Sequence, residues 1–346
     1  MELTSVTAVV GSCVPERSAV AHGIAQRSGS EFIHAERLAA AADPVREATA
    51  LIPWTAASRV VVEYPVQAPM PAIIGSLVDP EEPTRLVEVV CVIDATHFFS
   101  ELERTDRVEH LEFHHGTAFT TASARALLTA QQIEYCSTAL LTNAQHVPSE
   151  ERDLIRALIG ELAPWAKIVL EQDAYESFRQ GADDAAETYG SHQVRPGWIA
   201  HLNGLHTARP KHPRVASMRY TNPRPFNPVR LQRALDEYLE PGAGGKVIRS
   251  CGFCRLASRP GITAAWSHTG AVMVIDPLAR DDTTPGEPLS FGQDIILTGI
   301  DLRPVELTRI LDEAVLDDAE LLSDPASWRH MPDPFPAWVT AGDRFE

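Results

Sequence analysis

The chain lacks lysine before Lys167, so its first half has none of the compact cation that phosphate-binding loops use. Its five cysteines are odd in number and lack framework spacing, which argues against a disulfide-stapled fold and for reduced thiols in the cytoplasm. No apolar run reaches about 18 residues, so no membrane span is expected. The start, Met1–Thr4, has no basic stretch followed by an apolar region, so we expect no secretion signal and a cytoplasmic location.

Basic residues are also scarce, with 30 Lys and Arg against 47 Asp and Glu. The resulting net charge of −17 argues against non-specific nucleic-acid binding by the whole molecule. Hydrophobic residues make up 44% and charged residues 22% of the chain, as in ordinary globular proteins. A length of 346 residues is typical of about two domains.

A strand-like run, Val6–Val10, leads into a segment placed like the phosphate-binding loop G-x-x-x-x-G-K-[ST]. Gly11 and Ser18 fit that pattern, but Glu16 replaces the second glycine and Arg17 the lysine. Glycine is needed there because backbone N–H groups must approach the phosphate without a Cβ in the way. A carboxylate in that space would repel phosphate by about 1 kcal/mol in water and about 4 kcal/mol at an effective dielectric of 20. The segment therefore predicts a disabled phosphate site.

The second half contains a series of segments that resemble, in order, the signature segments of CobW-like GTPases. They are Gly197–His206, Arg224–Leu231, Lys246–Pro260, Trp266–Gly270, Phe291–Ile300, Trp328 and Asp333–Trp338. The resemblance implies a P-loop domain followed by the small C-terminal domain of that family.

Fainter similarity to the same family is found in Arg59–Pro65, Val89–Ala95 and Gln132–Gln145. Where the family reads guanine with Asn, Lys and Asp, this chain has Thr142, Asn143 and Gln145. The family's Cys-x-Cys-Cys motif is missing, since no cysteine lies between residues 13 and 91. The pattern resembles the degenerate actinobacterial branch, whose members are described as recruiting a ribosome hibernation factor when zinc is scarce.

Alternating strand and helix patterns predict an α/β fold: a parallel P-loop-type sheet over 1–180, a linker over 181–214 and a smaller α+β domain over 215–346. The expected strands are 5–10, 59–64, 86–94, 136–141, 166–170, 214–220, 246–257, 271–276 and 293–301. The expected helices are 16–28, 36–50, 69–78, 96–105, 119–134, 149–162, 228–240 and 303–316. A surface loop is expected over 277–290.

Ligands of such sheets bind at the carboxyl ends of the strands. By resemblance, the degenerate nucleotide site comprises Gly11, Glu16, Arg17, Ser18, Glu63, Asp94, Thr142, Asn143 and Gln145. Glu63 and Asp94, with Ser18, are candidates to hold Mg²⁺ beside GTP. No catalytic residue is predicted.

Two further groups are weak candidates for metal ligands. Cys251 and Cys254 resemble half of a zinc knuckle, but a strand would place their sulfurs on opposite faces. His110 and His114 would be neighbours on a helix, although Gly116 suggests a solvated helix end instead. Zinc is thus an alternative cofactor to GTP and Mg²⁺.

Residues 195–233 contain eight Arg or Lys and no acid, directly after an acidic run over 171–187. One interpretation is a solvated linker whose cations pair with that acidic run. The other is a face for an anionic partner such as ribosomal RNA, formed by Arg209, Lys211, Arg214 and Arg224.

The leading hypothesis is a cytoplasmic adaptor with an impaired GTP site. By resemblance, its partner is the ribosome or a ribosome hibernation factor in a zinc-limitation response. The alternatives are a GTP-dependent metallochaperone with a non-standard nucleotide pocket, or a nucleotide- or metal-sensing regulator without turnover. The missing cysteine triad disfavours metal delivery, because soft thiolates hold Zn²⁺ best.

Overall fold

The computed structural model describes residues 3–55, 57–114, 117–174, 189–190, 196–207, 210–240, 242–281 and 290–338. Its contacts divide the chain into two compact units. The N-terminal unit comprises Met1–Gly197 and His206–His212, and the C-terminal unit comprises Trp198–Leu205 and Pro213–Glu346. No helix within the described ranges is long and apolar enough to cross a bilayer.

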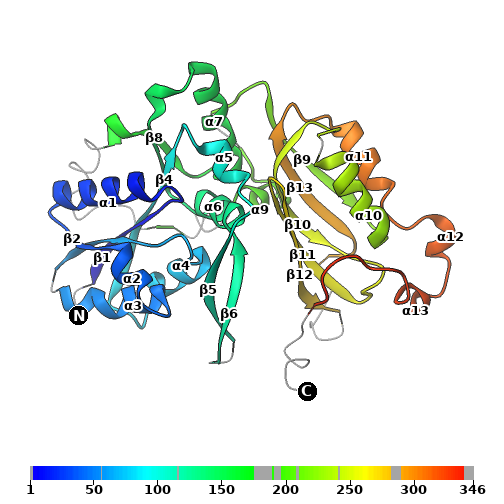
Figure 1. Ribbon diagram of the computed structural model, residues 1–346, viewed down its shortest axis with the longest axis horizontal. Coiled ribbons are helices and arrows are strands. Elements are labelled where there is room, and N and C mark those ends of the chain that lie inside the picture. Colours follow the sequence, from blue (N-terminus) through cyan, green and yellow to red (C-terminus); the bar gives the residue numbers. More distant parts are fainter. Residues whose placement is uncertain are drawn as a thin grey trace. The chain divides into compact units, whose positions relative to one another are not determined.

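A six-stranded parallel sheet forms the centre of the N-terminal unit (Figure 1). In spatial order its strands are β2 (Glu31–Ile33), β3 (Arg59–Glu63), β1 (Thr4–Val10), β4 (Thr84–Asp94), β7 (Thr138–Thr142) and β8 (Lys167–Leu170). The central strands are continuous Val, Ile and Leu runs and are almost wholly buried, because helices cover both faces. The predicted parallel α/β sheet is confirmed.

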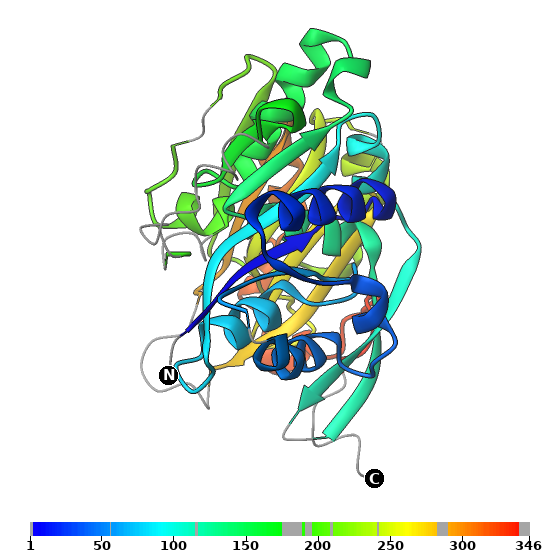
Figure 2. The same cartoon turned by 90° about the vertical axis from the view of Figure 1, so that its left-hand side faces the viewer.

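Helices connect these strands. They are α1 (Val14–Ser28), α2 (Ala35–Ala39), α3 (Pro44–Leu51), α4 (Met70–Val78), α5 (Phe98–Leu102), α6 (Arg125–Glu134) and α7 (Ser149–Leu162), with short 3₁₀ turns at Ile52–Thr55 and Ala144–His146. Figures 1 and 2 show α1 on one side of the sheet and α3 on the other.

The single helix expected over 36–50 is wrong. Asp43 accepts hydrogen bonds from the amides of Val45 and Arg46, and Pro44 occupies the first helical position, so α3 starts afresh. Proline is tolerated there because that amide would have no helical partner.

Secondary structure around residue 114 also differs from the prediction. β5 (Arg107–His114) and β6 (Thr117–Ala124) form an antiparallel pair separate from the main sheet. The helix expected from residue 119 starts only at Arg125. Thr and Phe residues in 117–121 favour an extended chain over a helix. His110 and His114 therefore lie on a strand, where the helical spacing proposed for them does not apply.

The C-terminal unit contains a five-stranded antiparallel sheet. In spatial order its strands are β12 (Val272–Arg280), β11 (Ile262–Thr269), β10 (Lys246–Cys254), β13 (Gln293–Ile300) and β9 (Val215–Asn222). Its helices are α9 (Gly197–Leu202), α10 (Pro228–Ala234) with a π-helical turn at Leu235–Leu239, α11 (Pro304–Asp312), α12 (Asp318–Leu321) and α13 (Pro325–Trp328). The predicted α+β class of this part is confirmed.

The core of this unit lies between the sheet and α10 and α11. Tyr220, Phe226 and Trp266 pack there with Leu231 and Leu307, all buried. Strand β11 was not predicted, and β12 extends into the loop expected from residue 277. A tight turn at Gly270, with φ of 58°, pairs the two strands, a conformation that suits glycine. Within the predicted linker, residues 197–202 form α9.

Candidate functional site

The carboxyl ends of four neighbouring strands of the parallel sheet bring most of the predicted site residues to one edge. Val9 on β1 is in register with Glu63 on β3, and Asp94 on β4 is in register with Thr142 on β7. Gly11 follows directly after β1. This is the edge at which open α/β sheets bind ligands.

The connection from β1 to α1 is short. Only Gly11, Ser12 and Cys13 separate the two elements. Gly11 has φ of 152°, and a Cβ there would lie 2.5 Å from the backbone oxygen of Val92, which explains the glycine. The backbone N–H of Arg17 donates to the Cys13 carbonyl at 3.0 Å, as in a regular helix. Arg17 and its neighbours thus belong to the first turns of α1 rather than to a loop.

Arg17 is buried and points into the protein. Its Nε donates to Glu63 Oε1 at 2.9 Å and its Nη1 to the Gly11 carbonyl at 2.7 Å. Ser18 Oγ donates to the same Glu63 oxygen at 2.6 Å, and the backbone N–H of Ala35 donates to Glu63 Oε2 at 3.3 Å. Glu63 thus has a close cation and two further donors, and the structure brings four predicted site residues, Gly11, Arg17, Ser18 and Glu63, together around a buried ion pair.

Asp94, on the other side of β1, has different neighbours. Its Oδ1 accepts from the backbone N–H and the hydroxyl of Thr96, and its Oδ2 from His97 Nδ1 at 2.7 Å. Burial raises the pKa of Asp94, but the donors of Thr96, His97 and Asn143 outweigh burial and hold this pKa below its usual value. The hydrogen bond and charge of Asp94 in turn raise the pKa of His97, whose side chain is 61% exposed.

Cys13 completes a group of possible metal ligands at this position. One ligand atom each from Cys13, Asp94 and His97 lies within 4.8 Å of the other two. Burial raises the pKa of the Cys13 thiol to about 11, and the charges of Glu101, Asp94 and Glu16 add to this rise. The sequence interpretation missed Cys13 and His97. The sequence does carry a signal for them: His97 follows the strand-end residue Asp94 by three positions, and Cys13 follows the neighbouring strand β1.

The positions that would read guanine lie at the end of β7. Thr142 is buried, and its backbone carbonyl accepts from the N–H of Ala95 at 3.1 Å. Asn143 has φ of 55°, a left-handed conformation that asparagine tolerates, and its side chain hydrogen-bonds to Asp94. Gln145 is exposed. Asn143 is therefore one of the hydrogen-bond partners of Asp94.

The other predicted metal ligands are two cysteines, Cys251 and Cys254, and two histidines, His110 and His114. Cys251 and Cys254 are both buried on β10, and burial raises the pKa of Cys254 to about 12. Within the described ranges, neither belongs to a group of three or more potential ligands. The side chains of His110 and His114 lie outside the described residues.

The four residues of the predicted basic face are divided equally between the two units, with Arg209 and Lys211 in the N-terminal unit. Arg209 lies outside the described residues, and Lys211 is exposed. Arg214 forms an ion pair with Asp301 at 2.7 Å, and both side chains are about half exposed. Arg224 contacts the Leu316 carbonyl at 3.1 Å and Asp318 at 2.6 Å.

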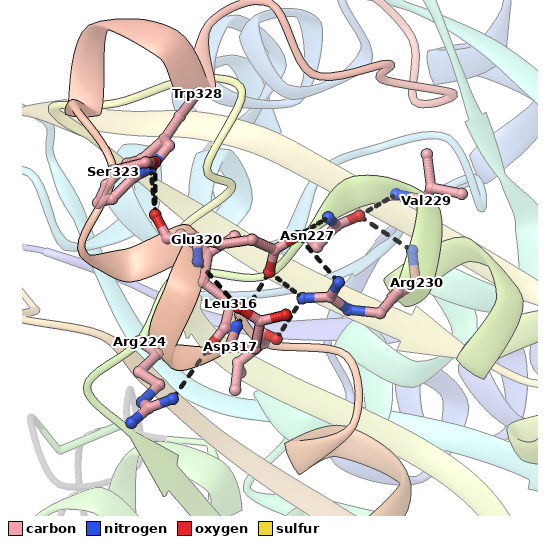
Figure 3. Close-up of polar contacts among 10 residues, drawn as sticks. Arg224, Asn227, Val229, Arg230, Leu316, Asp317, Glu320, Ser323 and Trp328 are labelled. Atoms are coloured by element: carbon pink, nitrogen blue, oxygen red, sulfur yellow. Dashed lines mark hydrogen bonds and ion pairs between the residues drawn. The ribbon is translucent and has the colours of Figure 1, made fainter.

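The acids that the described residues pair with Arg214 and Arg224, Asp301 and Asp318, belong to the C-terminal unit. Figure 3 shows Arg224 and Arg230 directed at the segment that contains Leu316 and Glu320. Arg230 donates to both carboxylate oxygens of Glu320 and to the Val315 carbonyl. The family-like segment 224–231 thus anchors the chain that follows α11.

One family model and several known proteins are similar to this chain. Residues 215–315 match the family model of the cobalamin synthesis protein cobW C-terminal domain. The chain is 24% identical over 286 residues to "Zinc-regulated GTPase metalloprotein activator 1" of Dictyostelium discoideum, which covers 76% of this chain and 58% of the relative. It therefore spans little more than half of that relative's length.

Two solved structures are also similar, the Zn(II)-bound YjiA GTPase from E. coli and a Zn(II)-bound triple mutant of YjiA. Each is 12% identical, with a TM-score of 0.36 and coverage of 91% of this chain and 100% of the other. The sequence comparisons thus support a relationship of the chain to the CobW-like GTPase family, and the family model covers residues 215–315.

Proposed function

We propose that this chain is a CobW-like protein with an impaired GTP site that acts as an adaptor rather than as a GTPase. The observation that carries the proposal is the position of Arg17. This residue stands where the motif has its phosphate-binding lysine, yet its guanidinium is buried against Glu63 and Gly11. A cation held in that way is not available to a phosphate.

The backbone around Arg17 supports the same proposal. Phosphate loops hold their ligand with backbone N–H groups that have no partner in the protein. Here the N–H of Arg17 is bonded to Cys13, and Pro15 has no N–H at all. Glu16 adds a carboxylate in the same turn. These residues do not fit a triphosphate, and the Glu63 oxygens predicted to hold Mg²⁺ already accept from Arg17, Ser18 and Ala35.

The proposed partner is the ribosome or a ribosome hibernation factor, as the resemblance to the degenerate branch implies. The CobW C-terminal domain over 215–315 and the exposed Lys211 are consistent with an interaction role. Co-sedimentation of purified protein with ribosomes, with and without the factor, tests this part. No co-sedimentation in either condition contradicts it.

Nucleotide turnover tests the first part of the proposal. We expect no Mg²⁺-dependent GTP hydrolysis above blank. The informative variant is Ser18→Ala, because a Mg²⁺-binding hydroxyl would be lost, and Ser28→Ala at the far end of α1 is its matched control. Turnover that Ser18→Ala abolishes and Ser28→Ala leaves intact contradicts the proposal.

A second candidate function is metal handling. The similar Dictyostelium protein is called a zinc-regulated GTPase metalloprotein activator, and Cys13, Asp94 and His97 of this chain offer a mixed set of metal ligands. If the chain delivers metal, a zinc-loaded preparation should transfer its ion to an apo-metalloprotein. An adaptor that only recruits a partner should not do so.

A further inference from the structure

We propose that Cys13, Asp94 and His97 form a binding site for a single divalent transition-metal ion, and that Zn²⁺ is the ion their donor set suits best. The site lies at the carboxyl ends of β1 and β4. The proposal is independent of whether the chain binds GTP or the ribosome.

The geometry of the three side chains is close to that of a metal site. Their ligand atoms lie within 4.8 Å of one another, and Asp94 and His97 already touch at 2.7 Å. In a tetrahedral zinc site, bonds of about 2.0–2.3 Å place the ligand atoms roughly 3.5 Å apart. A bound ion would require the Asp94 and His97 ligand atoms to separate from 2.7 Å, and the exposed His97 side chain can rotate to do so.

The donor types select the class of ion. A thiolate, an imidazole and a carboxylate together favour Zn²⁺ or a similar transition metal. Mg²⁺ and Ca²⁺ prefer all-oxygen sets and are not expected to compete. Three protein ligands leave a fourth position for water or a partner's side chain, as in open zinc sites.

Neighbouring groups orient the ligands. Thr96 donates twice to Oδ1 of Asp94, which leaves Oδ2 for His97 or for an ion. Asn143 adds a further hydrogen bond to the same carboxylate. Outer contacts of this kind fix ligand orientation and typically change metal affinity by about 10–100-fold when removed.

The environment of Glu101 also supports a cation site at this position. Its Oε1 accepts from Arg104 at 3.2 Å, but its buried Oε2 has no hydrogen-bond partner within the described ranges. Its charge acts on both Cys13 and His97. A buried carboxylate oxygen without a partner is unfavourable, and a divalent ion among Cys13, Asp94 and His97 would compensate its charge.

Binding of Zn²⁺ displaces protons from its ligands. The Cys13 thiol releases its proton to solvent and its sulfur donates an electron pair to the ion. If Nδ1 of a neutral His97 becomes the ligand, its proton leaves to solvent and Nε2 takes one up, so His97 adds no net proton release. Zinc uptake should therefore release protons, more at neutral than at alkaline pH.

The test uses the full-length protein and Zn²⁺ alone, in competition with a chromophoric chelator. We expect about one equivalent of tightly bound Zn²⁺. Cys13→Ser and His97→Ala should each weaken binding by at least about 100-fold, and Glu101→Gln by about 10-fold. The exposed His146→Ala and the buried Cys136→Ala are matched controls that should bind as the parent does.

Co²⁺ provides a second readout. A thiolate-to-Co²⁺ charge-transfer band should appear in the parent and be absent from Cys13→Ser, while circular dichroism shows that the variant is folded. No zinc uptake, or uptake that persists in both Cys13→Ser and His97→Ala, overturns the proposal. A metal site confirmed alongside GTP turnover would refute only the proposed loss of GTPase function.

Discussion

Two arginine–carboxylate pairs, one in each unit, show how differently the same chemistry is used. Arg17 and Glu63 have side chains only 3% and 2% exposed, whereas Arg214 and Asp301 are 48% and 55% exposed. The first pair has further hydrogen bonds from Ser18 and Ala35. The second can exchange its contacts with water. Burial, more than distance, therefore decides what each pair contributes.

This difference bears on stability. A buried pair is favourable only when its remaining hydrogen bonds are satisfied, and breaking it leaves an uncompensated charge. In the N-terminal unit, the contacts of Arg17 and Glu63 with each other thus stabilise the fold. Exposed pairs contribute little to stability, and their side chains can exchange contacts with water.

The largest expected effect comes from breaking the buried pair. Arg17→Met should lower the free energy of unfolding of the N-terminal unit by about 3–5 kcal/mol, because Glu63 is left buried without its cation. Hydrogen exchange of peptides from β1 and β3 measures this. The double variant Arg17→Met/Glu63→Leu should recover most of the loss. If Arg17→Met alone lowers the free energy of unfolding by less than about 1 kcal/mol, the buried pair contributes no more than an exposed one, and the contrast between the two pairs is wrong.

His268 should give the C-terminal unit its own strong response to acid. Burial, together with the nearby Arg249 charge, lowers the pKa of His268 to about 4, and its Nδ1 has no partner within the described residues. The unfolded chain binds this proton below pH about 6.5 and the folded chain only near 4. Stability should therefore fall as pH drops from about 6.5 to 4, by up to about 3 kcal/mol.

Denaturant unfolding across that pH range measures the effect of His268. His268→Gln should flatten the profile of the C-terminal unit and leave that of the N-terminal unit unchanged. An identical profile in the variant would show that other groups cause the acid response.

Arg230 should lie between the two extremes. Its side chain is 34% exposed and binds Glu320 and the Val315 carbonyl. Arg230→Ala should destabilise the C-terminal unit by about 1–2 kcal/mol through lost charged hydrogen bonds. Thermal unfolding followed by tryptophan fluorescence is suitable, since Trp328 donates to the Glu320 carbonyl at 2.9 Å. A change as large as that of Arg17→Met would contradict the ranking by burial.

The smallest stability effect is expected for Arg214. Arg214→Glu, alone or with Arg209→Glu and Lys211→Glu, should change stability by only about 0–1 kcal/mol per residue. If these residues bind an anionic partner, the triple variant should lose ribosome co-sedimentation, and parent binding should weaken steeply with salt. Binding that survives both would place the partner surface elsewhere.

The sequence predicted the parallel sheet well because its strands are continuous apolar runs between helical patterns. It also placed Glu63 and Asp94 at the carboxyl ends of their strands. It did not predict that Arg17 turns inward, since a rotamer and its buried partner depend on packing. The proximity of Cys13 to His97 was missed because residues 84 positions apart in the sequence meet only once β1 and β4 pair. The acid partners of the arginines were missed for the same reason.

The short connection between β1 and α1 has a consequence for protein engineering. Side chains are exchanged by single substitutions, so Glu16→Gly and Arg17→Lys are easily made. Neither change lengthens the backbone, and the helix would still start at Val14. Converting this edge of the sheet into a nucleotide pocket would require residues 14–16 to leave the helix as well as altered side chains. Loop grafting, rather than point mutagenesis, is therefore the appropriate design strategy for this scaffold.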